Sequence, residues 1–172
     1  MIFQIFLLTS VGRSFAQNTS AGGWKQISTI PVCVTPRDNG YGNMMYYQES
    51  KLVAALKLKF HSRQIRCSDN EAYNSKWGCG DSRTYPLNII VTDESNHVIF
   101  PLPQYIKANG MWYYLPLVDP IYSDELVFDD FAHPLYLKEF DRLRFWYGED
   151  LSKTDYMDNQ GRVCFHVLAR FM

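Results

Sequence analysis

Short runs in which apolar and polar residues alternate recur along the chain, and they predict β-strands. The clearest covers residues 55–61, where Leu56, Leu58 and Phe60 alternate with two lysines and a histidine. A period of two gives such a strand one apolar and one polar face. Only the stretch 46–55 is expected to form a short helix. The further candidate strands cover residues 31–34, 87–91, 97–100, 111–115, 125–128, 131–137, 143–147 and 163–169.

Turn-forming residues separate these runs. The polar sequence at 92–96 predicts a turn, so that 87–91 and 97–100 should pair as a hairpin. No helical period extends over three turns, and no internal repeat or low-complexity linker divides the chain. Short, regularly spaced strands with turn signals predict an all-β fold, a single disulfide-stapled β-sandwich that is jelly-roll-like, over residues 31–172. Residues 17–30 should form an exposed N-terminal arm that leads into the first strand.

The first segment indicates export from the cell. Residues 2–11 are apolar but too few to span a bilayer, and Ser14 and Ala16 fit the small-residue positions of a signal-peptidase site. We therefore expect a signal peptide over 1–16, although no Lys or Arg precedes its apolar run; the alternative is a buried N-terminal element. Asn18 opens a glycosylation sequon just inside the expected mature end. No other stretch is apolar and long enough to span a membrane, so the protein should be secreted.

The four cysteines agree with export. An even number of cysteines in an exported chain predicts disulfides, and four cysteines allow three pairings. Cys67 and Cys79 flank a polar loop of eleven residues that a bridge would restrain, which leaves Cys33 to pair with Cys164. That second bridge would join the first strand of the sandwich to the last. Zinc binding is the disfavoured alternative, because the spacing is not CxxC and the histidines are scattered.

Charge and motifs exclude several functions. The chain has 172 residues and a formal net charge of −1, so it carries no basic field for nucleic acid or an anionic membrane. No G-x-S-x-G, H-E-x-x-H, P-loop or dinucleotide motif occurs. Adjacent acidic pairs would point to opposite faces of a strand. We therefore expect a protein that is not an enzyme.

Aromatic residues make up 16% of the chain. Most should pack in the core, since flat rings fit a pleated surface. The alternative is that exposed indoles stack on sugar rings, for which the candidates are Trp77, Trp112 and Trp146. Packing against the core or a disulfide is the favoured interpretation.

Two polar loops are candidates for cation binding. The loop at 147–161 gathers carboxylates of the kind that calcium binds, although not at EF-hand spacing. A solvated loop is the favoured alternative, so no cofactor is expected unless this loop binds calcium. The second loop, at 37–43, need not lie at the same end of the sandwich, so the two are treated separately. The tentative calcium ligands are Glu149, Asp150, Asp155 and Asp158.

Four runs resemble a group of secreted cnidarian proteins that includes proteins of the coral skeletal organic matrix. They cover residues 30–34, 76–79, 143–151 and 158–164. The resemblance implies a function in the extracellular matrix, and its coral members extend this expectation to biomineralisation. It implies no catalytic residues. The chain lacks the long acidic runs of strongly mineral-binding matrix proteins.

The leading expectation is therefore a secreted, non-catalytic structural or interaction component of an extracellular matrix, such as the organic matrix of a calcified skeleton. Its partners would be matrix components or glycans. The alternative is a secreted carbohydrate-binding, lectin-like module.

Overall fold

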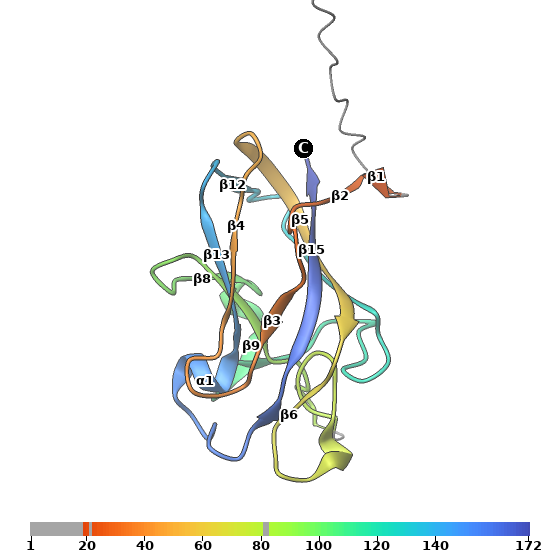
Figure 1. Cartoon of the computed structure of the whole chain (residues 1–172), viewed down its shortest axis with the longest axis vertical. Helices are drawn as coiled ribbons and strands as arrows, with labels where there is room; N and C mark the ends of the chain where they lie inside the picture. Colours follow the sequence, from red (N-terminus) through yellow and green to blue (C-terminus); the bar gives the residue numbers. More distant parts are fainter. Residues whose placement is uncertain (1–18, 21, 81–82) are drawn as a thin grey trace, which may run out of the picture.

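The computed structural model describes residues 19–20, 22–80 and 83–172, and Figure 1 shows their arrangement. The expected signal peptide over 1–16 and the sequon at Asn18 lie outside the described residues. Nearly all regular structure in the described part is antiparallel β, as the hydrophobic pattern predicts.

The larger sheet contains the two longest strands. β15 (Val163–Phe171) and β5 (Lys51–Ser62) pair along most of their length and form its centre. The strand order along the sheet is β1-β2-β15-β5-β11, with β3 also paired to β15 and β12 to β5. The remaining members are β1 (Thr19–Ser20), β2 (Trp24–Gln26), β3 (Val32–Val34), β11 (Glu125–Asp129) and β12 (Leu135–Leu137).

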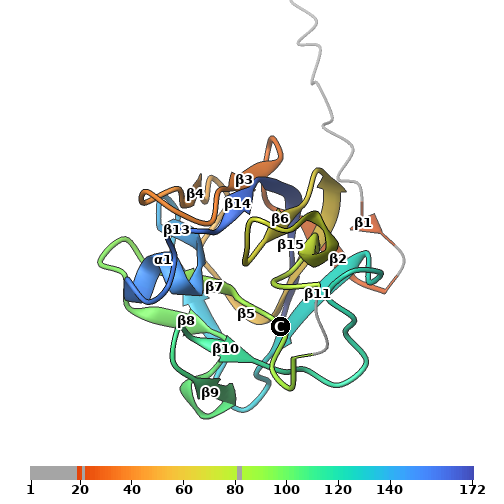
Figure 2. The ribbon, with the colours of Figure 1, turned by 90° about the horizontal axis from the view of Figure 1, so that it is seen from below.

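The second sheet has four strands in the order β4-β13-β7-β8. These are β4 (Gly42–Met45), β13 (Arg142–Tyr147), β7 (Ile89–Thr92) and β8 (Val98–Phe100). The expected hairpin across 92–96 is confirmed, because β7 pairs with β8. Figure 2 shows β13 and β7 on one side of the molecule and β15 and β11 on the other, which is the two-layer arrangement of a sandwich.

The remaining elements are short and lie outside the two main sheets. Two small strand pairs join β9 (Ile106–Ala108) to β10 (Trp112–Tyr113) and β6 (Ile65–Arg66) to β14 (Gln160–Gly161). The helices are η1 (Glu71–Tyr73), η2 (Pro103–Tyr105) and α1 (Gly148–Ser152). In Figure 1, α1 lies at the end of the molecule opposite the C-terminus. Across the described residues, no helix has the length and hydropathy to cross a membrane.

The core lies between the sheets and follows the predicted alternation. Leu56 and Leu58 of β5 are fully buried, whereas Lys59 on the other face is exposed. Phe145 of β13 meets Phe165 of β15 edge to face, with ring centroids 5.4 Å apart, and thereby joins the two sheets. Fully burying side chains of this size stabilises the fold by about 1.5–3 kcal/mol each.

Both predicted disulfides are confirmed. Cys33 of β3 bonds to Cys164 at a point where the two residues are directly opposed in adjacent strands. Cys67 bonds to Cys79 across the loop that contains η1. The described part contains no free cysteine.

Two expectations about local structure were wrong. The described residues of the segment 17–30 are not simply an exposed arm, because β2 pairs with β15 and both Ile27 and Ser28 are buried. The stretch 46–55 forms no helix, and β5 begins within it at Lys51. β2 adds to the side of β15 that faces away from β5, and the start of β5 lies between β12 and β15, so in both cases the strand forms through hydrogen-bond partners that local sequence does not reveal.

Candidate functional site

The three tryptophans proposed to stack on sugars are all buried. Trp77 is 0% exposed, and Trp112 and Trp146 are each 4% exposed. The Trp77 Nε1–H donates to the Ser123 carbonyl (2.7 Å), and the Trp146 ring packs on Tyr41. An indole without an exposed face cannot serve as a stacking platform, so the sugar-stacking prediction is wrong for these residues. All three tryptophans instead pack in the core, as the favoured interpretation of the sequence predicted.

Asp150 joins the two polar loops that the sequence analysis kept apart. Its side chain is fully buried, and its oxygens accept the backbone N–H groups of Asn39 (3.3 Å) and Gly40 (3.1 Å). Lys153 donates to the same carboxylate (2.9 Å) and to the Asn39 side chain (2.7 Å). The loops therefore lie at the same end of the sandwich, and Asp150 holds them together.

Glu149 is the second buried carboxylate of α1. Its Oε1 accepts the Trp112 Nε1–H (2.9 Å), and its Oε2 accepts the Asn159 side-chain amide (2.9 Å). Asn159 is itself fully buried and also donates to the Pro36 carbonyl (3.3 Å). The Asn159 Oδ1 has no hydrogen-bond partner among the described residues. Trp112 therefore contributes through its N–H, and its ring is part of the core.

The start of α1 is held by Asn88 and by close packing of two glycines. The Asn88 side chain donates to the Gly110 carbonyl (2.8 Å) and accepts the Glu149 N–H (3.1 Å). A Cβ on Gly148 would lie 2.8 Å from the Gly110 carbonyl oxygen, and Gly110 has φ +78°. The sequence Asn109-Gly110 is a turn signal, and here it turns the chain from β9 into β10 beside α1.

These elements enclose a polar cleft of about 480 Å³. The loop before β7, the β9–β10 turn, and α1 with the turn after it each contribute side chains. The volume is within the usual range for small-ligand sites. The residues lining the polar cleft are Arg83, Thr84, Tyr85, Ala108, Asn109, Trp112, Glu149, Thr154 and Asp155.

Both signs of charge line this cleft. The Arg83 guanidinium lies 4.8 Å from the centroid of the Trp112 ring, within cation–π range. Burial raises the pKa of Glu149, and Asp155 adds to the rise, whereas the hydrogen bonds from Asn159 and Trp112 and the Arg83 charge oppose it. The polar cleft therefore presents donors and acceptors side by side.

The structure brings together three of the residues singled out from the sequence. Trp112, Glu149 and Asp155 line one cleft, whereas Asp150 binds backbone elsewhere and Asp158 does not line the cleft. Within the described ranges, no group of three or more His, Cys, Asp or Glu side chains converges as metal ligands do. Calcium binding stays a prediction.

Sequence reasoning missed Arg83, Tyr85 and Asn109. The Asn-Gly turn signal at 109–110 was visible in the sequence and marks one wall of the cleft. Arg83 and Tyr85 precede β7 without any motif, so only the fold brings them to α1.

Fold and site together define a disulfide-bonded antiparallel β-sandwich with a polar cleft at one end. The solved structure of the sea anemone lectin AJLec, from Anthopleura japonica, has this fold, with a TM-score of 0.76. The two sequences are 32% identical, and the match covers 88% of this chain and 98% of AJLec. The chain therefore belongs to the same protein family as AJLec. No protein-family model and no curated protein matches it.

The expected resemblance to cnidarian proteins agrees with this comparison, because AJLec comes from a sea anemone, which is a cnidarian. The comparison gives no support to the narrower resemblance to skeletal matrix proteins.

Proposed function

We propose that this protein is a secreted carbohydrate-binding protein. The observation that carries the proposal is its family membership with the lectin AJLec, at 32% identity over nearly the whole of that chain. This favours the lectin-like alternative over the extracellular matrix component that the sequence analysis preferred. No finding supports a role in a calcified skeleton, and we do not propose one.

The polar cleft is the proposed binding site. Each sugar hydroxyl both donates and accepts hydrogen bonds, so a site needs both kinds of partner close together. Glu149 and Asp155 supply carboxylate acceptors, and Arg83 and Asn109 supply donors. Charge-assisted hydrogen bonds are about twice as strong as neutral ones, which suits a polar ligand that must leave water.

The polar cleft is also preorganised at Glu149, which is almost fully buried. Two hydrogen bonds fix the Glu149 carboxylate and a third fixes its backbone N–H, so a ligand meets an acceptor that is already in place. A fixed group loses little conformational entropy on binding. The two disulfides and the expected signal peptide support an extracellular location. We propose binding without turnover.

A glycan array and calorimetry would test this function on the full chain expressed as a secreted protein. Wild-type protein should bind a subset of glycans, and Asp155→Asn and Asn109→Ala should each weaken binding at least tenfold. Glu94→Gln and Asn43→Ala are matched controls, because both side chains are exposed and lie outside the polar cleft. The controls should bind like wild type.

Absence of binding to every glycan on the array would refute the function. Normal binding by both cleft variants would refute the site while leaving the function intact. Mass spectrometry of the bound glycan after prolonged incubation should return the intact compound, and cleavage products would contradict the proposal of binding without turnover.

A further inference from the structure

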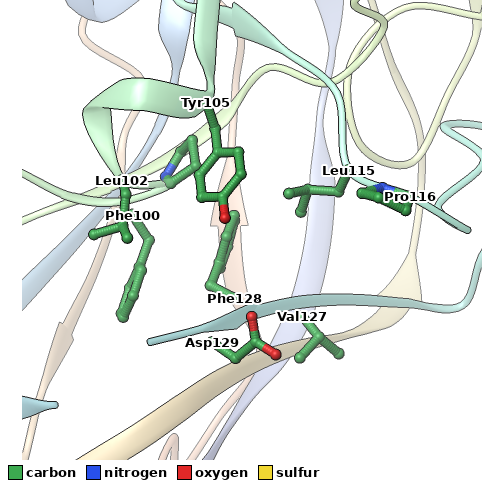
Figure 3. Close-up of a pocket in the computed structure, with 9 residues that line it drawn as sticks. Phe100, Leu102, Tyr105, Leu115, Pro116, Val127, Phe128 and Asp129 are labelled. Carbon is green, nitrogen blue, oxygen red and sulfur yellow. The ribbon is translucent and has the colours of Figure 1, made fainter. Parts of the chain in front are cut away.

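A second cleft, of about 280 Å³, lies at an edge of the sandwich (Figure 3). It forms where β8 and β11, which end the strand orders of the two sheets, are bridged by the segment 101–116. It shares no lining residue with the polar cleft. We call it the edge cleft; its main lining residues are Phe100, Tyr105, Leu115, Val127, Phe128 and Asp129.

The walls of the edge cleft are apolar and anchored in the core. The Phe100 and Phe128 rings stack with centroids 5.6 Å apart and planes 10° apart, and each is almost fully buried. Leu115 and Val127 are partly buried on the other side. The Tyr105 ring, 41% exposed, stands in the middle of the view in Figure 3. An apolar body entering here would meet preformed aromatic and aliphatic walls.

Among the residues that line the edge cleft, only Tyr105 and Asp129 have polar side chains. Asp129 is exposed, and within the described residues its carboxylate accepts no hydrogen bond and forms no ion pair. By contrast, the adjacent Asp130 accepts the His133 N–H (3.0 Å) and lies 3.4 Å from the His133 ring nitrogen. In Figure 3 the Asp129 carboxylate and the Tyr105 hydroxyl point toward the same space. One negative charge is thus presented at the rim of an apolar cleft.

From this geometry we propose that the edge cleft binds a small organic cation, an ammonium group on an apolar body. The ammonium pairs with Asp129 and lies against the face of Tyr105, because aromatic faces attract cations. The apolar body leaves water for the walls formed by Phe100, Leu115 and Val127. A sugar fits this cleft poorly, since its hydroxyls would face carbon atoms without hydrogen-bond partners. An anion would be repelled by Asp129.

Titration calorimetry with 2-phenylethylamine, and with its neutral analogue 2-phenylethanol, would test the proposal on the full chain. The amine should bind with a dissociation constant on the order of 1 mM or tighter, within the range available to a ligand of this size. The alcohol should bind at least about tenfold more weakly. Asp129→Asn keeps the shape of the side chain and removes its charge, so it should weaken the amine at least tenfold and leave the alcohol unchanged.

Glu94→Gln, an exposed carboxylate outside the edge cleft, should bind the amine like wild type. The proposal is refuted if amine and alcohol bind equally, if Asp129→Asn leaves amine affinity unchanged, or if the amine does not bind. Equal melting temperatures for wild type and Asp129→Asn would show that a loss is not due to unfolding. The result is independent of glycan binding, because Asp155→Asn should retain amine binding and Asp129→Asn should retain glycan binding.

Discussion

Replacing Asn88 by alanine would test how the fold positions the polar cleft. Asn88 is fully buried just before β7, and its side chain links the β9–β10 turn to α1. It donates to the Gly110 carbonyl (2.8 Å) and accepts the Glu149 N–H (3.1 Å). Alanine removes both bonds and supplies no substitute. Both partners are buried, so water would have to enter the site to satisfy them.

The expected loss follows from counting the groups left without a partner. An unsatisfied buried polar group costs about 1–3 kcal/mol, so two such groups place the loss of unfolding free energy at about 2–6 kcal/mol. For a domain of this size, about 1 kcal/mol shifts the melting temperature by about 2–4 °C. Asn88→Ala should therefore melt at least about 4 °C below wild type.

Urea unfolding followed by tryptophan fluorescence would measure this loss, and calorimetry would give the melting temperature. Asn43→Ala is the matched control: its side chain is exposed, so its effect should stay within about 0.5 kcal/mol. At temperatures where Asn88→Ala is fully folded, its glycan affinity should still fall, because the Glu149 backbone is no longer held. If Asn88→Ala were as stable as Asn43→Ala, the reasoning about buried partners would be wrong.

Three further predictions concern the bridges, acidity and calcium. Replacing Cys33 and Cys164 by serine should lower the free energy of unfolding by about 5 kcal/mol, and replacing Cys67 and Cys79 should lower it by about 3 kcal/mol. The difference arises because the two bridges span 131 and 12 residues, so the longer one restrains the unfolded chain more. Equal urea midpoints for the two double variants would contradict this. Burial raises the pKa of Glu149, so the stability that its protonated form contributes is fully present below about pH 4.3 and is lost as pH rises through the raised pKa. Glu149→Gln should flatten this part of a curve of unfolding free energy against pH. An unchanged slope would exclude Glu149 as the source of the pH dependence. Calcium bound at the predicted site should raise the melting temperature, and a chelator should reverse the rise. Both shifts should be larger in wild type than in Glu149→Gln. Equal melting temperatures of the wild type with calcium and with chelator would refute the site.

The strands could be predicted from the sequence because each is a local pattern. The alternation at 55–61, the hairpin across 92–96 and the aromatic run at 143–147 all appear as strands of the fold. The disulfides were also predictable. The polar loop between Cys67 and Cys79 indicated one bridge, and elimination gave the other. The strand β2 was missed, because it forms only where β15 offers an open edge.

The polar cleft was harder to predict, because no single segment that lines it carries a recognisable binding motif. Trp112 was singled out for its ring and is used through its N–H, which only the position of Glu149 reveals. Two acidic neighbours in sequence, Glu149 and Asp150, face different partners, since one accepts from Trp112 and the other from the loop at 37–43. A sequence shows that these carboxylates are close in the chain but not which way each one points.

By itself, then, the sequence determined an antiparallel β fold and its two bridges, because periodicity, turn residues and cysteine spacing act over short distances or through a single covalent constraint. The tertiary structure decided which strands share a sheet, which indoles are buried, and which polar residues meet. Asn88, Gly110 and Glu149 are far apart in the chain and are brought together at one end of the sandwich. The same applies to Tyr105 and Asp129, which line one cleft only because two sheet edges are bridged by one segment. Both clefts depend on contacts between distant segments, and such contacts leave no periodic signal in the sequence.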